Sequence, residues 1–312
     1  MLTYPIPGST LVGNATVAQV LAFLKSPTEL ARRFADIMSD HNFLAHYLLR
    51  GRYEIVGGAI VYLPDEVIET EDGPETIAPG GEYPLVALNA DAPQIVAAMK
   101  KGFGTEIADE TVGRLRLDPV ERAIQRLAYT MVSTFDGIAL AAIMSAVTQS
   151  VQGAAWTGDS ASLNLVSGVE AAKASIRAKR QGYEPNTIVL TGPQYAKAAP
   201  ALMSILPREQ GNPVVNGTWP NVLGLDWVTS DDLPEDWTPT VVDANNLGGI
   251  GHEDIPSPEY VDLSAIVAGN GSNVEVARYR EKNDSTRVQI RKADVPVVRN
   301  PDAACEIEGT GL

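Results

Sequence analysis

The 312-residue sequence has little cysteine, little histidine and no long apolar run. Its single cysteine, Cys305, excludes an internal disulfide framework, and because no histidine lies nearby to activate the thiol, we expect a small buried residue. No uninterrupted apolar stretch reaches the roughly 18 residues of a membrane span, and residues 1–12 lack the pattern of a signal peptide. We therefore expect a soluble protein that is made in the cytosol and contacts no membrane.

Positive charge is absent from two long stretches of the chain. Residues 53–99 contain nine carboxylates and residues 209–277 contain twelve, and neither stretch contains lysine or arginine. The whole chain has 24 basic and 39 acidic side chains, and this net charge of −15 argues against binding of nucleic acid through phosphate contacts. Basic residues lie in the alternating stretches 100–126, 173–180 and 278–299, which favours electrostatic attraction between copies of the chain.

The signatures of catalytic and metal sites are missing or incomplete. His41 and His46 are five residues apart on an expected helix, so they do not share the face that a metal requires. His252-Glu253-Asp254 follows a glycine-rich stretch, but a P-loop lysine and the full dinucleotide fingerprint are absent. Ser272 lacks the last glycine of a nucleophile elbow. We predict no catalytic, cofactor-binding or metal-binding residue.

Apolar patterns predict the main elements. Residues 53–70 are rich in β-branched and aromatic residues, which predicts the first strand of a long acidic hairpin, with residues 83–88 as its second strand. Asp118-Pro119 is a good helix start, and apolar residues at helical spacing continue the helix to about Val147. Further patterns predict a helix over 164–181, a strand over 187–190, a helix from Thr191 and long strands over 274–298. Among apolar neighbours, Trp219, Trp227 and Trp237 are expected in the core or at an interface.

The order of these parts is similar to that of a known family. The local stretches that carry the resemblance are Lys100-Lys101-Gly102-Phe103-Gly104 leading to Ile107-Ala108-Asp109-Glu110, Gly182 to Leu190, Leu223 to Ser230, and Val288-Gln289-Ile290-Arg291 through Arg299 to Ala303. The chain resembles the major capsid proteins of tailed bacteriophages, of the actinobacterial-phage type, which have the Hong Kong 97 fold. The resemblance covers nearly the whole chain.

This resemblance implies an α+β fold of four parts. They are an N-terminal arm (1–49), an extended β-hairpin loop (50–98), a peripheral domain with a long spine helix (99–159 and 278–293) and an axial domain (160–277 and 294–312). The implied function is that of a non-enzymatic shell subunit, which forms pentamers and hexamers around the double-stranded DNA of a tailed phage. It would be made in the host bacterial cytoplasm and reside in the virion capsid.

The expected partners are other copies of the chain, a separate scaffolding protein, a portal protein and, optionally, a decoration protein. The hairpin is expected to lie across one neighbour and the arm under another. Six charged residues are predicted at these contacts, namely Arg52, Glu54, Glu69, Glu71, Arg278 and Arg280. Relatives that crosslink themselves use a lysine on the extended loop, and because residues 53–99 contain none, no such isopeptide bond is expected.

Three alternatives remain open at this point. The same fold could form the shell of an encapsulin, a nanocompartment that encloses a cargo enzyme. The second alternative is a metal-dependent α/β enzyme that uses His252, Glu253 and Asp254 beside the glycine-rich stretch. The third is a tail or decoration protein, although such proteins are usually smaller and lack this order of parts.

Overall fold

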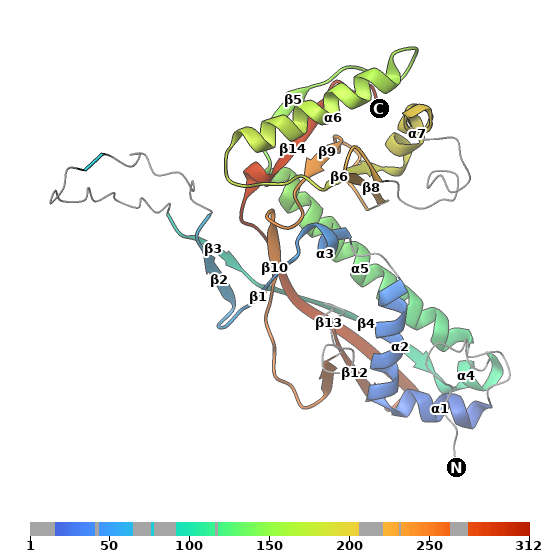
Figure 1. Cartoon of the computed structure of the whole chain (residues 1–312). Coiled ribbons are helices and arrows are strands. Elements are labelled where there is room, and N and C mark those ends of the chain that lie inside the picture. The colour runs from blue at the N-terminus through green and yellow to red at the C-terminus, as the bar shows by residue number, and fades with distance from the viewer. Residues whose placement is uncertain are drawn as a thin grey trace.

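The computed structural model describes residues 16–40, 44–64, 76–77, 92–115, 118–205, 221–230, 232–262 and 274–312. A long helix, α5 (Asp118–Ala146), connects its two main parts (Figure 1). One β-sheet runs along this helix, and a second sheet with two helices lies at the C-terminal end of α5. A two-stranded ribbon extends from the side of the first sheet. The predicted α+β class is confirmed.

The first sheet has the strand order β1-β10-β13-β12-β11, with β4 on the opposite side of β13. Its strands are β1 (Gly51–Glu54), β4 (Met99–Ala108), β10 (Gly248–His252), β11 (Tyr260–Asp262), β12 (Glu275–Arg280) and β13 (Ser285–Val298). The 14-residue β13 is the central strand and runs antiparallel to β4, β10 and β12. The long strands predicted over 274–298 are thus confirmed as β12 and β13.

Helix α5 joins two hydrophobic cores. It begins at the predicted Asp118-Pro119 start, and its 29 residues make a helix roughly 44 Å long. Val120 and Met131 are buried in the core that α5 shares with the first sheet, whereas Leu140 and Ile143 are buried in the core of the second sheet. The helical segment Pro119–Ala146 is long enough and apolar enough to cross a membrane, judged by length and composition alone. Its burial in two cores explains this apolar character without a membrane.

The three N-terminal helices are α1 (Val17–Lys25), α2 (Pro27–Asp40) and α3 (Leu44–Leu48). They pack on their own chain. Leu30 and Phe34 of α2 are fully buried in the core formed with α5 and β12, and Leu48 of α3 is buried in the core of the second sheet. The apolar face of α2 thus finds a partner within the same chain, and contact of the arm with a neighbour stays a prediction. Residues 1–15 lie outside the described residues.

The ribbon consists of β2 (Ala59–Tyr62) and β3 (Gln94–Ala97) in antiparallel pairing. The single strand predicted over 53–70 is wrong, because β1 ends at Glu54 and belongs to the first sheet through parallel pairing with β10. Gly57 and Gly58 then adopt φ of 82° and 83°, a left-handed conformation that glycine tolerates, at the point where the chain leaves the sheet for the ribbon. Residues 83–88 lie outside the described residues.

The second sheet has the order β5-β14-β9-β6-β8-β7. Its elements are β5 (Ser150–Gln152), α6 (Ala161–Ala178), β6 (Thr187–Thr191), α7 (Gly192–Ile205), β7 (Asn221–Val222), β8 (Leu225–Ser230), β9 (Thr240–Val242), the 3-10 turn η1 (Pro301–Ala303) and β14 (Ala304–Glu308). Helices α6 and α7 pack on each other and on this sheet. The predicted strand over 187–190 and the helix from Thr191 are confirmed. Trp227 and Trp237 are buried as predicted, and Trp219 lies outside the described residues.

Strand pairing divides the chain differently from the predicted boundaries. Residues 248–277 are predicted in the axial part, but β10, β11 and β12 pair in the first sheet. Residues 294–298 are predicted there too, but they continue β13. Residues 150–152 are predicted in the peripheral part, yet β5 pairs with β14 in the second sheet. These assignments depend on pairing between strands that are distant in sequence, which local patterns do not reveal.

Candidate assembly surfaces

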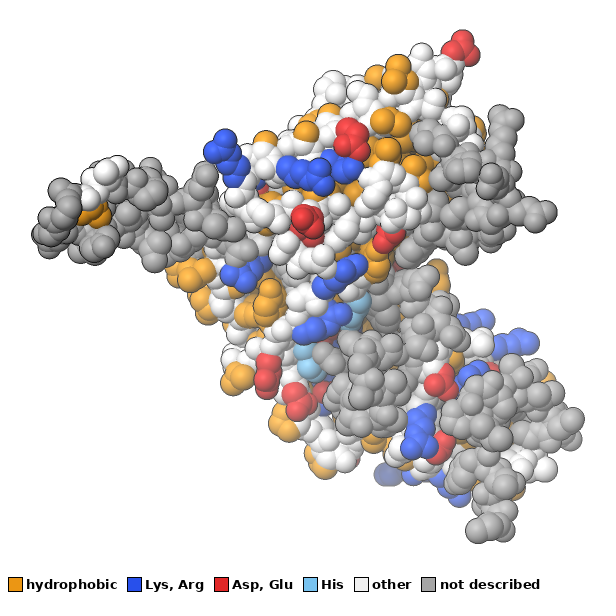
Figure 2. Space-filling model, in the orientation of Figure 1, with side chains coloured by type: hydrophobic (Ala, Val, Ile, Leu, Met, Phe, Trp, Pro, Cys, Tyr) orange, Lys and Arg blue, Asp and Glu red, His pale blue; other side chains and the backbone are white. Residues whose placement is uncertain are grey.

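The β2–β3 ribbon has one packed face and one exposed face. The packed face lies on a small core that includes Val295 and Val297 of β13. On the other face the directly paired Val61 and Ile95 are 61% and 70% exposed, and Leu63 beside them is exposed as well. Figure 2 shows hydrophobic side chains gathered where Figure 1 draws the ribbon. We term Val61, Leu63 and Ile95 the ribbon face. An exposed apolar face on a two-stranded ribbon indicates a contact surface.

A groove of about 610 Å³ lies between β4 and the first half of α5, and its end is closed by α4 (Asp109–Leu115). Its lining includes apolar side chains from all three elements, such as Phe103, Leu115 and Leu127. All six residues from Phe103 to Ala108 line it, which means that the groove runs along the strand. In the described part of the chain β4 pairs only with β13, so the groove follows an open strand edge.

Four cations lie on or near this groove. Arg122 and Arg126 are one helical turn apart on its α5 wall, and Lys100 and Lys101 lie on β4 toward the ribbon. Within the described ranges, none of the four side chains takes part in an ion pair or a hydrogen bond. The groove, which we term the β4 groove, therefore combines an apolar lining with unpaired positive charge. It is complementary in sign to residues 53–99, which contain nine carboxylates and no cation.

The predicted contact residues on β1 differ in their availability. Arg52 donates to the carbonyl oxygen of Leu49 at 2.7 Å, and its Nη2 lies 3.0 Å from Nδ1 of His46. Its charge is thus engaged within the chain. Glu54, in contrast, is exposed at the end of β1. Two further predicted contact residues, Glu69 and Glu71, lie outside the described residues.

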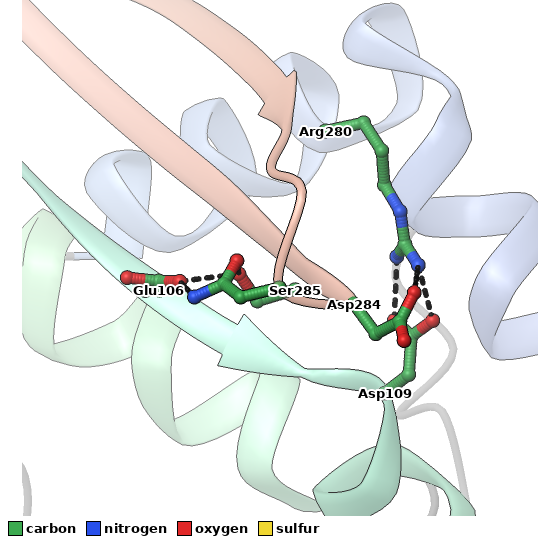
Figure 3. A network of polar contacts seen from close by, with 6 residues as sticks. Glu106, Asp109, Arg280, Asp284 and Ser285 are labelled. Carbon is green, nitrogen blue, oxygen red and sulfur yellow. Dashed lines mark hydrogen bonds and ion pairs between the residues drawn. The ribbon is translucent and has the colours of Figure 1, made fainter.

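Arg280 ends β12 and holds together a polar network at the tip of the β12–β13 hairpin (Figure 3). It donates to both carboxylate oxygens of Asp109, at 2.7 Å each, and to Asp284 at 3.3 Å. These hydrogen bonds lower the pKa of Asp109, the first residue of α4. Arg280 therefore fixes the hairpin tip to the start of α4 within one subunit. Arg278 is half-buried on the same strand and is not part of this network.

A second part of this tip is held by Glu106 of β4. Its carboxylate accepts hydrogen bonds from the Ser285 hydroxyl and, at 2.7 Å, from the Asn283 amide (Figure 3). Both bonds favour the charged form, so they lower the pKa of Glu106. These partners could not be predicted from local sequence patterns, because they are about 180 residues from Glu106 along the chain. These bonds connect the hairpin tip to β4 at the β4 groove, whose lining includes Glu106.

A buried ion network lies where α3, β10 and β13 meet. Nζ of Lys292 is 2.8 Å from Oδ2 of Asp294, and Nδ1 of His252 is 2.6 Å from Oδ1 of the same carboxylate. Burial alone would raise the pKa of Asp294, but Lys292 and His252 outweigh burial and hold it below its usual value. His46 faces Lys292, and burial together with Lys292 and Arg52 lowers its pKa to about 3. His46 is therefore neutral.

This network places His252 in a structural role. The enzyme alternative requires His252, Glu253 and Asp254 to act together, but the imidazole of His252 is directed to Asp294. In the described part of the chain, no three histidine, cysteine or acidic residues form a group that could hold a metal ion. Cys305 is buried, as predicted, and burial raises the pKa of its thiol to about 11.

A comparison with protein families decides between these interpretations. The family model described as phage capsid protein matches residues 91–307, more than half of the chain. The chain belongs to the phage capsid protein family. No match was found among curated proteins.

Solved structures give the same fold at low sequence identity. The virus-like particle from Pyrococcus furiosus is 11% identical, with a TM-score of 0.56 over 90% of this chain and 98% of that chain. The capsid of the cyanophage P-SCSP1u is 14% identical, with a TM-score of 0.57 over 87% and 89% of the two chains. The capsid of a native GTA particle is 11% identical, with a TM-score of 0.54 over 86% and 91%. At such identities the likeness shows the fold alone, and it confirms the predicted Hong Kong 97 type.

The protein is thus a structural protein of a phage capsid, located in the virion shell. The predicted family, fold and shell role are confirmed. The β4 groove and the ribbon face were not found from the sequence, because each consists of residues from segments that only the fold brings together. The charge separation between residues 53–99 and 100–126 was the signal that pointed toward them.

Proposed function

We propose that this chain is the repeating subunit of an icosahedral shell that encloses the double-stranded DNA of a tailed phage. The observation that carries the proposal is a pair of unlike surfaces, an exposed apolar ribbon face and a cationic, apolar groove on β4, in a chain whose residues 53–99 contain nine carboxylates and no cation. Because the two surfaces differ, each copy can bind the next one head to tail, and such heterologous contacts close into rings. Rings of five and six copies would form the shell.

The loop of one subunit would lie across the first sheet of its neighbour. The second sheet with α6 and α7 would then form the axial part at the centre of each ring, and the first sheet the peripheral part. The exposed Glu54 and the acidic residues Glu69 and Glu71 would contribute charge to these contacts. Arg52, Arg278 and Arg280 are proposed there as well, with Arg52 and Arg280 acting through the parts of the subunit that they fix.

The way in which the shell would enclose DNA follows from the net charge of the subunit. With a net charge of −15 the subunit would repel phosphates, so DNA would be enclosed without being held tightly at particular sites. We also propose a separate scaffolding protein, a portal protein and, optionally, a decoration protein as partners, and synthesis in the host bacterial cytoplasm. Because the loop contains no lysine, mature particles should not show a ladder of isopeptide-linked subunits on a denaturing gel.

Electron microscopy tests the proposal directly. The chain would be expressed alone and together with the genes that neighbour it, and the particles would be imaged after purification. We expect rings of five and six or closed polyhedral shells. A small oligomer of uniform size under every condition would contradict the proposal, and closed shells filled with a protein cargo would indicate a nanocompartment instead.

A further inference from the structure

Among the residues that the structure describes, one edge of β4 has no partner strand, and its backbone N–H groups point away from β13. The N–H group of Asp109, directly after the strand, donates to the carbonyl oxygen of Asp284 at 3.0 Å and so continues the pairing with β13. In an antiparallel pair, residues that exchange hydrogen bonds alternate with residues that do not. Counting back from Asp109, the N–H groups that point away from β13 are those of Gly102, Gly104, Glu106 and Ala108.

Such an edge requires a cover. β4 is ten residues long, and a long open edge is a template for pairing with another strand unless it is shielded. Gly102 and Gly104 have no side chain that could shield it, and Phe103 between them is 37% exposed. The same stretch lines the β4 groove, so an incoming strand would find backbone partners, apolar surface and positive charge together.

We propose that this edge receives a strand from the acidic loop of a second copy, residues 65–71, so that the neighbour extends the first sheet. This inference rests on the proposed shell function, since the second copy is the neighbour in the shell. The contact would be a β-augmentation, in which main-chain hydrogen bonds supply affinity and side chains supply specificity. Pairing of backbone groups would fix the position and direction of the incoming strand, which attraction between opposite charges alone does not determine.

The sequence of this segment suits the groove. It reads Asp65-Glu66-Val67-Ile68-Glu69-Thr70-Glu71, with strand-forming residues in its middle. Seven extended residues span about 23 Å, against about 20 Å for the six residues of β4 that line the groove. On a strand, Glu69 and Glu71 share one face at a spacing of about 6.6 Å. Arg122 and Arg126 are separated by about 6 Å along α5, so two ion pairs can form at once.

A second copy is a better donor than the same chain. β3 leads almost directly into Met99, so the ribbon lies at one end of β4 (Figure 1). The groove lies toward the other end, where Ala108 precedes α4. Residues 65–71 follow the ribbon strand β2 closely in sequence, and a neighbour whose ribbon approaches the α4 end would deliver them to the groove. This is the head-to-tail geometry of a ring.

Amide hydrogen exchange at single-residue resolution tests the inference on unassembled subunits and on assembled particles. We expect the amides of Gly102, Gly104 and Glu106 to exchange at least about 100-fold more slowly in particles than in subunits. The inward amides of Phe103 and Thr105 serve as the internal control and should be protected in both states. Equal rates for the outward amides in both states, whether fast or slow, would overturn the inference while leaving the shell function intact.

If no particles form, that result counts against the shell function and leaves this inference untouched. A peptide experiment on unassembled subunits then decides the inference. A synthetic peptide of residues 64–73 is titrated into unassembled subunits, beside two versions that are N-methylated at Val67 and Glu69 or at Ile68 and Thr70. In a β-ladder only one alternate set of N–H groups faces β4. We expect one methylated peptide to lose at least about ten-fold in affinity and the other to bind like the parent. Equal binding of all three, or no binding of the parent, would overturn the inference.

Discussion

Lys292 and Asp294 are charged side chains that lie buried on β13. Lys292 is 1% exposed and Asp294 is 4% exposed, and the two side chains form an ion pair, without which burial of either charge would be costly. The Lys292 ammonium also lies 4.7 Å from the centre of the Phe135 ring of α5. Through His252 and His46 the pair joins β13 to β10 and α3. A buried ion pair gives little net stability, so its effect here is to fix how these elements meet.

Asp136 of α5 is a second buried charge at this junction and carries a pH prediction. It accepts hydrogen bonds from the N–H groups of Leu44 and Ala45 at the start of α3, both at 3.1 Å. Burial outweighs these bonds and raises its pKa to about 6, with Asp232 adding to the rise and Lys292 opposing it. The unfolded chain has an aspartate pKa of about 3.9. Between these values the folded state binds more protons, so stability falls as the pH rises.

Replacing Asp136 with asparagine should remove this pH dependence. Relative to the D136N variant, the wild type should lose on the order of 3 kcal/mol of unfolding free energy between pH 4 and pH 7. The measurement is urea denaturation of unassembled subunits at a series of pH values. D159N, at an exposed aspartate, is the control and should follow the wild type. Parallel pH profiles for wild type and D136N would show that Asp136 does not titrate in this range.

Among the secondary-structure elements, α5 has a glycine at its middle that the fold does not require. A Cβ built at Gly137 meets no atom within 4 Å. The G137A variant should therefore gain about 0.5–1 kcal/mol in unfolding free energy, because alanine costs less conformational entropy in a helix. At Gly248 of β10 a Cβ would lie 2.1 Å from the carbonyl oxygen of Val297, so G248A should be strongly destabilised. Chemical denaturation of both variants measures the contrast, and a loss of stability in G137A would show that α5 needs a glycine there.

The elements also show how far sequence patterns reach. The start of α5 was predictable because an Asp-Pro pair is a common signal for a helix start and the apolar spacing that follows is a local property. The packing partner of α2 was not predictable, because the sequence pattern of the buried face around Phe34 is the same whether that face packs on its own chain or on a neighbour. The prediction of one strand over residues 53–70 was wrong for a related reason. Tyr53 and Val61 read as one strand, yet two glycines between them send the chain from the first sheet to the ribbon.

The candidate surfaces were only partly predictable, for the same physical reason. The acidic stretch 53–99 and the basic stretch 100–126 are visible in the sequence and pointed to contact between copies. The partner of Arg280 was not visible, because Asp109 is 171 residues away and meets it only through the pairing of β4 with β13. Charge patterns therefore indicated contact between copies, and the fold was needed to propose where it lies.

In the whole molecule, stability and assembly depend on different surfaces. The two cores bury the apolar residues of α2, α5 and both sheets within one chain. The ribbon face and the β4 groove remain exposed, and they lie at different places on the first sheet. We therefore expect the subunit to fold alone and then to associate through the ribbon face and the β4 groove. Changes in the β4 groove should therefore affect assembly far more than folding.

A charge swap tests this separation. The R122E/R126E variant should assemble poorly, because the reversed groove repels the acidic loop, while its unfolding free energy stays within about 1 kcal/mol of the wild type. The E69K/E71K variant should show the same defect. Combining all four substitutions restores opposite signs across the contact and should restore assembly yield, measured by sedimentation and electron microscopy at low and high salt. The matched control, R177E/K197E, changes the same charge on exposed residues of α6 and α7. If the fourfold variant assembled no better than either double variant, Glu69 and Glu71 would not be the partners of Arg122 and Arg126.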